Sequence, residues 1–567
     1  MKTTKSKTEL NLPKETKFNL LEEKWILVRK SDCTVAELSV TDVLLHAHEH
    51  KELAGELPTQ DISIQRFLGA ILQTVFSRYT VSGELQEIEN ESDARNRWKT
   101  WWSAGQFPEK PIQSYLAQWH DRFWLFHPER PFYQTNAAQI GTPYDAKKLN
   151  GAVSESGNKI RLFSARSGAW KNTLTYPEAA RWLLHINSFD DSSGKKKTEG
   201  TGSPGVGYLG KLGLIAAKGE NLFETLMLNL IPFNLTSKEI WPSECPIWEL
   251  DQPRSAERCV IAPPKSLSEL YTLQSRRIIL ISEGEFVTKY KLLGGDFYGD
   301  DTDVYIEPMT FWDNDKNKKT QINPKKFDSS IRMWREFAAV FENGEESSSP
   351  GVMRWVNYID RKKLIDRRKQ IVFQIISMTY GSKNSSVSDT FTQSLTFHAD
   401  LLTNIGERWR TIIAGEVSKY DKTVESLAEL VKAVKKAAGM SPKTVDELFI
   451  AKKENAKKEK KDQQNACEQF YFSVDIPFRE WLASIDPQWE IGSDEEYECL
   501  EHWHNTVKTI ANRLANELVK EAGNPAIVGR MVEEKQKSKK KYYSASKELN
   551  IFNAELNKRY PKEEHNV

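Results

Sequence analysis

Apolar residues recur at helical spacing early in the chain and again over most of its last third. The early stretch predicts a core helix capped by Asp61, with inward positions Ile64, Phe67, Leu68, Ile71, Leu72 and Val75. A shorter helix is expected to begin at Ser39 or Thr41, whose hydroxyl groups are good helix caps.

The last third carries two long apolar stripes and two shorter apolar faces. The stripes are Val424, Leu427, Ala428, Val431, Val434 and Ala438, and then Val507, Ile510, Ala511, Leu514 and Leu518. The shorter faces are 395–402 and 478–482. Three or four such helices must bury their stripes against each other, which predicts a helical bundle.

The part between these helices lacks long helical stripes and shows short strand and loop patterns instead. A short strand is expected at 24–29, and further strands at 277–281 and 304–306. Residues 188–220 are rich in Gly, Ser and Lys and predict a loop. A polar connector follows at 381–388. We therefore expect an α+β fold, with a large mixed α/β domain at 1–385 and a four-helix bundle at 386–567.

Aromatic residues crowd the segment from Trp98 to Tyr133. A large aromatic core explains them better than a ligand-stacking site, because aromatic side chains dominate buried cores.

Composition narrows the class of protein. Lys and Arg total 80 and Asp and Glu total 79, so the net charge of +1 argues against a strongly basic nucleic-acid binder but allows a local basic patch. The five cysteines are scattered without a CxxC pair, which favours a reducing cytoplasm over a zinc ribbon. We expect no membrane span and no secretory signal.

The segment 205–210 reads GVGYLG and matches the GxGxxG pattern. A dinucleotide site needs a buried strand directly before the glycines, and the preceding polar run cannot form one. Glycines flanked by lysines instead suit close approach to a phosphate backbone, although a surface loop without function fits the residues as well.

Histidines gather at His46, His48 and His50, and again at His502 and His504. On a helix His46 and His50 would share a face, but the pattern is not HExxH and lacks a further ligand. A metal-dependent nuclease is therefore an alternative that we disfavour. Such an enzyme would cut DNA by itself with magnesium or manganese. We expect no metal, no cofactor and no catalytic residue.

Basic runs occur at 452–461 and 535–541. Each fits a solvated surface or a groove for nucleic acid, and the second is the better candidate because it carries five lysines and no acid.

Several segments together resemble the CasA family, the large subunit of the type I-E CRISPR Cascade complex. The resemblance is carried by 18–29 (FNLLEEKWILVR), 53–61 (LAGELPTQD) and 130–135 (RPFYQT), and by the helical C-terminal part. It implies a non-catalytic subunit that recognises a PAM in double-stranded target DNA, opens the duplex for R-loop formation and docks an effector nuclease–helicase. The implied partners are the 5′ end of a guide RNA and the other Cascade subunits.

The resemblance also assigns sites. A loop near the guide RNA and the PAM falls on Leu162, Phe163, Ser164 and Ala165. A glycine loop that approaches the PAM from the minor groove falls on Gly205, Val206, Gly207 and Tyr208, where Tyr208 replaces a frequent glycine. A strand-splitting wedge falls on Lys383, Asn384 and Ser385, with Asn384 in the place of a familiar Gln.

DNA-backbone contacts are expected from lysines beside the glycine loop and in the second basic run, namely Lys195, Lys196, Lys197, Lys211, Lys537, Lys539, Lys540 and Lys541. An RNA-binding scaffold without DNA readout is the remaining alternative. The near-zero net charge suits a recognition module whose DNA affinity comes largely from an assembly.

Overall fold

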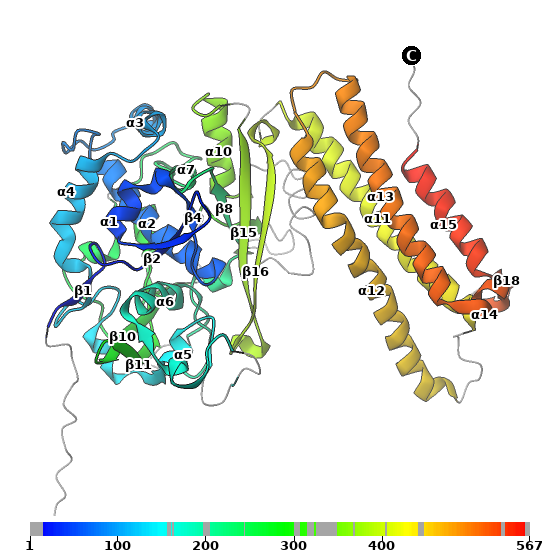
Figure 1. Cartoon of the computed structure of the whole chain (residues 1–567), viewed down its shortest axis with the longest axis horizontal. Coiled ribbons are helices and arrows are strands. Elements are labelled where there is room, and N and C mark those ends of the chain that lie inside the picture. Colours follow the sequence, from blue (N-terminus) through cyan, green and yellow to red (C-terminus); the bar gives the residue numbers. More distant parts are fainter. Residues whose placement is uncertain are drawn as a thin grey trace, which may run out of the picture. The chain divides into compact units, whose positions relative to one another are not determined.

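The structure is a computed structural model, and it describes residues 15–155, 160, 164–196, 204–242, 244–299, 307–313, 323–324, 349–366, 369–402, 405–439, 447–534 and 539–561. The chain divides into two compact units (Figure 1). The first comprises 1–327, 345–365 and 371–394, and the second comprises 328–344, 366–370 and 395–567.

The helices of the first unit surround a long central one, α2 (Pro58–Arg78). The others are α1 (Val40–Leu45), α3 (Glu91–Ala104), α4 (Glu109–Trp119), α5 (Ala146–Leu149), α6 (Tyr176–Phe189), α7 (Leu222–Leu228), α8 (Leu267–Tyr271) and α10 (Gly351–Arg361). Helix α2 packs against α4, α6, α7 and α8, so its apolar residues are buried on nearly every side.

Among the described residues of the first unit, three antiparallel sheets have three or more strands. One has the order β3 (Val35–Leu38), β2 (Ile26–Lys30) and β4 (His50–Leu53). Another has the order β10 (Arg276–Glu283), β11 (Phe286–Gly294) and β6 (Thr142–Asp145), with β7 (Leu174–Thr175) also on β11. The last has the order β16 (Val387–His398), β15 (Gln370–Tyr380) and β8 (Leu214–Lys218).

Short pairs and turns fill the remainder. The strand pairs are β1 (Lys17–Asn19) with β5 (Trp124–Phe126), β9 (Val260–Ile261) with β12 (Phe297–Tyr298), and β13 (Trp312–Asp313) with β14 (Asn323–Pro324). Single 3-10 turns lie at Ala47–Glu49, His120–Arg122, Asn136–Ile140, Gly168–Asn172, Leu209–Lys211, Ile247–Glu249, Ser382–Asn384 and Ala399–Leu402.

The second unit is mainly helical. Its elements are α11 (Glu407–Ala438), α12 (Glu447–Ser484), α13 (Asp494–Glu521), α14 (Gly523–Val528), the hairpin of β17 (Arg530–Glu534) and β18 (Lys539–Tyr543), and α15 (Ala545–Arg559). Helix α11 packs against α12, α13 and α15, and α13 packs against α12 and α15. The stripe positions Leu427, Val431, Val507 and Ala511 are buried between these helices, as their spacing predicts.

The aromatic segment after Trp98 forms core, which confirms the expectation from the sequence. Trp98, Trp101 and Phe123 are fully buried. Phe67 of α2 lies within 5.6 Å of Phe132 and 5.7 Å of Trp248, ring centre to ring centre. Each large side chain removed from water in this way stabilises the fold by about 1.5–3 kcal/mol.

Several local expectations need correction. Ser39 caps α1 as predicted, but α2 starts at Pro58, and Asp61 accepts a hydrogen bond from the Gly55 amide at 2.7 Å instead of capping the helix. Leu395 belongs to β16, not to a helix. The predicted loop 188–220 contains strand β8. The expected strand at 304–306 lies outside the described residues.

The polar segment 381–388, which we expected to connect two domains, forms the turn between the neighbouring strands β15 and β16 and the first two residues of β16. Strand β16 then carries the chain from the first compact unit into the second. The domain limits 1–385 and 386–567 stay a prediction.

Candidate nucleic-acid interface

The candidate interface is built around the segment that follows helix α6. This helix begins with a capping box between Thr175 and Glu178, and its apolar stripe draws it into the core. It ends at Phe189, so the next two residues, Asp190 and Asp191, are buried as well. Two neighbouring buried carboxylates are costly unless cations and hydrogen-bond donors surround them.

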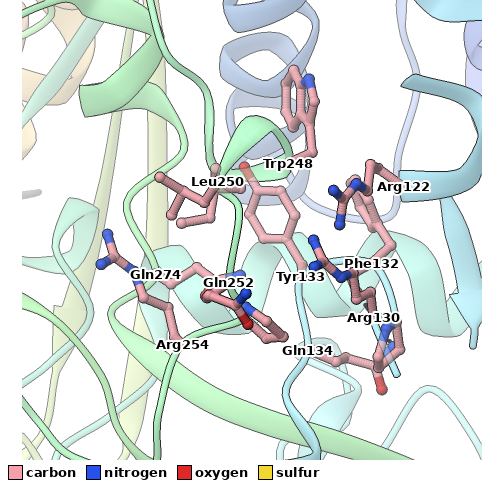
Figure 2. A pocket seen from close by; sticks show the side chains of 13 residues that line it. Arg122, Arg130, Phe132, Tyr133, Gln134, Trp248, Leu250, Gln252, Arg254 and Gln274 are labelled. Carbon is pink, nitrogen blue, oxygen red and sulfur yellow. Dashed lines mark hydrogen bonds between the residues drawn. The ribbon is translucent and has the colours of Figure 1, made fainter. Parts of the chain in front are cut away.

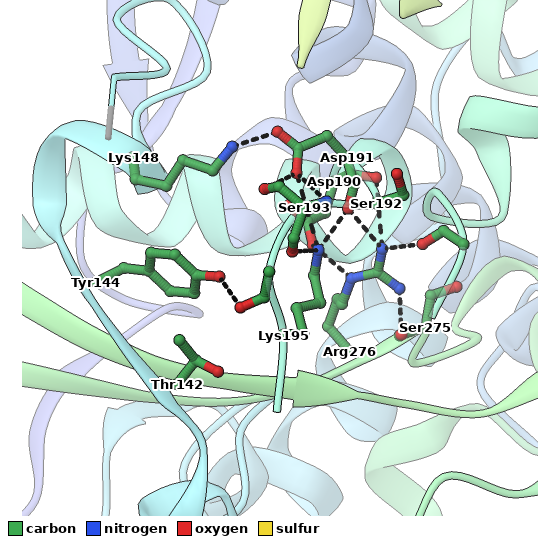
Figure 3. A network of polar contacts seen from close by, with 12 residues as sticks. Thr142, Tyr144, Lys148, Asp190, Asp191, Ser192, Ser193, Lys195, Ser275 and Arg276 are labelled. Atoms are coloured by element: carbon green, nitrogen blue, oxygen red, sulfur yellow. Dashed lines mark hydrogen bonds and ion pairs between the residues drawn. The ribbon is translucent and has the colours of Figure 1, made fainter. Parts of the chain in front are cut away.

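Three cations supply that compensation (Figure 3). The Lys195 ammonium lies 2.8 Å from Asp190 Oδ2, and Arg276 Nε lies 2.5 Å from the same oxygen. Lys148 pairs with Asp191. Burial alone would raise the pKa of Asp190, but Lys195 and Arg276 outweigh it and lower this pKa to about 2. Asp190 is therefore ionised and holds both cations in fixed positions.

Arg276, the first residue of β10, extends this network to the glycine loop. Its Nη2 donates a hydrogen bond to the Gly205 carbonyl at 2.6 Å. The Gly207 amide donates to the Asp190 carbonyl at 2.9 Å, and the Tyr208 amide donates to Ser275 Oγ at 3.2 Å. The glycine loop is thus attached to both the end of α6 and the start of β10.

The same segment also holds the turn between β15 and β16. The Ser192 amide donates to the Asn384 carbonyl at 2.9 Å, and Ser192 Oγ donates to the Lys383 carbonyl at 2.7 Å. Because the bonds use backbone oxygens of the turn, the exposed side chains of Lys383 and Asn384 stay available. The structure therefore brings the predicted glycine loop and the predicted wedge together on residues 190–192.

The two glycines of the loop are not equivalent. A Cβ atom at Gly205 would meet nothing within 4 Å, and Gly205 is exposed. A Cβ atom at Gly207 would lie 2.4 Å from the Ser188 carbonyl oxygen, so Gly207 is required for packing against α6. Close approach of a ligand to this loop is therefore confined to the surroundings of Gly205.

The other predicted loop residues face inward. Val206 is buried. The Tyr208 ring packs edge-on against Tyr298 at 5.6 Å, and burial raises the pKa of its hydroxyl group. Tyr208 is thus half-buried with its ring packed against the protein, which explains why a large side chain is accommodated at this position.

The prediction that Lys195 contacts the DNA backbone is wrong, because its side chain is buried. Its side chain is 1% exposed and bound to Asp190, and burial lowers its pKa. The neighbouring Lys196 is exposed. Its backbone amide donates a hydrogen bond to Thr142 Oγ1 at 2.7 Å, and its ammonium group donates one to the Ile140 carbonyl at 3.2 Å. Lys211 is exposed as well. Lys197 lies outside the described residues.

The guide-RNA loop is only partly described. Leu162 and Phe163 lie outside the described residues. Ser164 is half-buried, and its hydroxyl accepts a hydrogen bond from the Arg166 amide at 3.4 Å, while Ala165 is exposed. Arg166 pairs with Glu178, the capping residue of α6, so this end of the loop is anchored to the same helix as the glycine loop.

The second basic run lies on a strand of the other unit. Lys540 and Lys541 are exposed on β18, and the Lys541 ammonium lies 5.0 Å from the centre of the Tyr543 ring. Lys537 lies outside the described residues, and only the backbone of Lys539 is described.

The histidines do not combine into one site. Helix α1 ends before His46, and His50 begins β4, so the two do not share a helix face as the sequence suggested. His504 is buried with its Nε2 atom 3.0 Å from Glu416 Oε1. Over the described ranges, no group of three or more His, Cys, Asp or Glu side chains is placed to hold a metal ion.

Sequence reasoning missed Arg276 and the aspartates at the end of α6. Both left a signal, because an Arg-Arg pair opens an otherwise apolar strand at 276–281 and an Asp-Asp pair ends an apolar helix. Charges in such positions must be paired when the element is buried. The sequence alone does not show which pairs form.

Comparison with known proteins identifies the family. The family model "CRISPR-associated protein Cse1" matches residues 19–514. The CRISPR-associated protein CasA/Cse1 of Thermus thermophilus is 29% identical over 333 residues. That alignment covers 57% of this chain and 60% of the relative, which is less than two thirds of the relative's length.

Solved structures share the fold over nearly the whole chain. The crystal structure of Thermobifida fusca Cse1 has a TM-score of 0.77 at 27% identity, covering 96% of this chain and 98% of that one. A chain of a CRISPR RNA-guided surveillance complex has a TM-score of 0.69 at 16% identity, covering 95% and 99%, which is a likeness of fold. No helix in the described parts of this chain has the length and apolar character needed to cross a membrane. Because the family match spans most of the sequence, the chain belongs to the CRISPR-associated protein Cse1 family.

Proposed function

We propose that this protein is the non-catalytic large subunit of a type I-E Cascade surveillance complex, and that it recognises the PAM in double-stranded target DNA. The fold shared with a chain of a CRISPR RNA-guided surveillance complex supports membership of such an assembly. Guide RNA, the other Cascade subunits and an effector nuclease–helicase are the proposed partners.

The observation that carries PAM recognition is the shared attachment of two exposed elements. Gly205 bonds Arg276, and the turn at Lys383 and Asn384 bonds Ser192, within one network of buried ion pairs. A loop that reads a base pair and a side chain that separates the next one must keep a fixed spacing. A buried, ion-paired connector provides that rigidity.

In this proposal Gly205 lets the loop backbone reach base edges in the minor groove. Recognition there separates A·T from G·C pairs but not A·T from T·A or G·C from C·G, so several related PAM sequences should be accepted. The Asn384 side chain inserts beside the first base pair of the target. Opening that pair costs a few kcal/mol, which phosphate contacts from residues such as Lys196 help to offset.

We also propose that α11, α12, α13 and α15 act as a four-helix bundle. On the adjoining β17–β18 hairpin, the exposed lysines Lys540 and Lys541 would follow the displaced DNA strand. Docking of the nuclease–helicase is proposed from the family resemblance.

The test replaces Gly205 by leucine in the assembled complex. Because a Cβ atom at Gly205 would meet no atom within 4 Å and the residue is exposed, Gly205→Leu should fold and assemble normally. It should weaken binding of a PAM-bearing duplex about tenfold or more, measured by competition against a PAM-lacking duplex.

Gly415→Leu is the matched control, because Gly415 is also exposed and a Cβ atom there meets nothing within 4 Å. It should bind like the unmodified complex. Gly207→Leu is not suitable, since its clash with Ser188 would disturb folding. Unchanged discrimination between the two duplexes in Gly205→Leu would show that this loop does not read the PAM.

A further inference from the structure

A pocket in the first unit has a composition that the proposed function does not use. Around the ring of Tyr133, its polar lining comes from Arg122, Arg130, Gln134, Gln252, Arg254 and Gln274 (Figure 2). Its volume is about 60 Å³, several times the roughly 10–15 Å³ that one water molecule requires. We propose that this pocket binds a phosphate group.

The RPFYQT motif at 130–135 forms one wall of the pocket, and buried hydrogen bonds fix it. Gln134 Nε2 donates to the Leu125 carbonyl at 2.7 Å, while Gln134 Oε1 accepts from the Leu280 amide at 2.8 Å. The Thr135 amide donates to the Ile278 carbonyl at 2.9 Å. The wall is therefore held in place by β5 and β10 before any ligand enters.

Tyr133 adds an unusual conformation to this wall. Its φ of 54° lies in the left-handed region, which a bulky side chain rarely adopts. Such strain persists only where the surroundings fix it, and it is frequent at ligand sites. Arg130 and Gln134, on either side of this residue in the chain, both lie beside the buried Tyr133 ring in the pocket.

The charges of the pocket are unbalanced. Arg254 pairs with Asp296 at 3.1 Å, but in the described part of the chain no carboxylate forms an ion pair with Arg122 or Arg130. Arg130 Nη1 is buried without a hydrogen-bond partner. Arg122 lies near Arg130, and burial together with this second cation lowers the pKa of Arg122.

The nearby carboxylates of Asp121 and Asp251 offset the repulsion between these two guanidinium groups only in part, since the pKa of Arg122 is still lowered. The empty pocket therefore keeps an excess of positive charge, which a multiply charged oxyanion neutralises. A phosphate group offers up to two negative charges and several acceptor oxygens, and Arg forks bind it through paired hydrogen bonds. A carboxylate brings only one charge. The excess charge of the pocket therefore favours phosphate, supplied either free or on a nucleotide chain.

The experiment titrates the full-length protein with inorganic phosphate by calorimetry at constant ionic strength. We expect one site, with acetate binding at least about tenfold more weakly than phosphate. A 5′-phosphorylated trinucleotide and its unphosphorylated form complete the series. If the phosphorylated trinucleotide binds more tightly than inorganic phosphate, the natural ligand is the phosphate of a nucleotide chain. If the two bind equally, the natural ligand is free phosphate.

Arg122→Gln and Arg130→Gln should each weaken phosphate binding about tenfold, while Arg361→Gln, an exposed arginine outside the pocket, should not. Without phosphate, neither pocket variant should melt below the unmodified protein, because each removes a repulsion. The proposal is overturned if acetate binds as well as phosphate, if phosphate binding survives both substitutions, or if both variants lose stability without phosphate. None of these outcomes depends on PAM recognition.

Discussion

At the scale of single residues, His185 is the buried titratable group whose surroundings give the clearest consequence for stability. It lies on α6 with its Nε2 atom 3.1 Å from Thr59 Oγ1, between the rings of Trp182 and Phe189. Burial lowers the pKa of His185 to about 3. The folded protein therefore keeps this imidazole neutral at pH values where the unfolded chain protonates it.

The sign of the pH effect follows from this difference. Between pH 6.5 and 3 the unfolded state binds one proton more than the folded state, so stability falls as pH falls below 6.5. From pH 7 to pH 5 the loss from His185 should be about 2 kcal/mol.

Urea unfolding at pH 7 and pH 5 tests this, with His185→Gln as the reference that cannot titrate. The reference corrects for other groups such as Asp61, whose pKa burial raises to about 6 and which acts in the opposite direction. Equal losses in both proteins on acidification would contradict the assignment.

At the scale of elements, the turn between β15 and β16 stores conformational strain. Lys383 and Asn384 have φ values of 56° and 54°, in the region that glycine occupies freely. The Gly381 amide donates to the Ser386 carbonyl at 2.9 Å, which closes the turn. Ser192 donates to the carbonyl oxygens of Lys383 and Asn384 and so holds both strained residues in place.

Lys383→Gly should relieve part of this strain and stabilise the protein by about 0.5–1 kcal/mol. The bonds to Ser192 use backbone oxygens and survive the change. Thermal unfolding measures the effect. Ser382→Gly, one residue earlier and outside the left-handed region, should give no gain, because it only adds freedom to the unfolded chain. A loss of stability in Lys383→Gly would mean that the lysine side chain itself supports the turn.

At the scale of the whole molecule, the net charge of +1 limits how DNA can be bound. Because Lys195 is buried in an ion pair, fewer cations reach a phosphate backbone than the sequence suggests. Affinity for DNA should then depend on few phosphate contacts. Each such contact contributes about 0.9 to the slope of log K against log salt.

Lys196→Gln should reduce that slope by about 1 in the assembled complex, with similar losses on PAM-bearing and PAM-lacking duplexes. Binding isotherms between about 50 and 200 mM salt cover the range in which this effect is measurable. Lys110→Gln, an exposed lysine on α4, is the control with an unchanged slope. If the slopes of Lys196→Gln and the control agree, Lys196 does not contact DNA.

Local patterns in the sequence determined much of this protein. The spacing of apolar residues was sufficient for α2, α11 and α13, since a helical stripe is a property of neighbouring residues. The dense aromatics predicted a core, and three short motifs indicated the family. The start of α2 and strand β8 were missed, because residue type alone does not show which of several possible local structures a segment adopts in the folded protein.

Only the tertiary structure decided how the candidate site is assembled. Gly205 meets Arg276, and Ser192 meets Lys383, across long separations in the chain. The sequence marks Lys195, Lys196 and Lys197 alike, but burial beside Asp190 fixes the first as a structural residue. Pairing of buried charges depends on which elements pack together, and that is set by the summed burial of the whole core, which no single segment encodes.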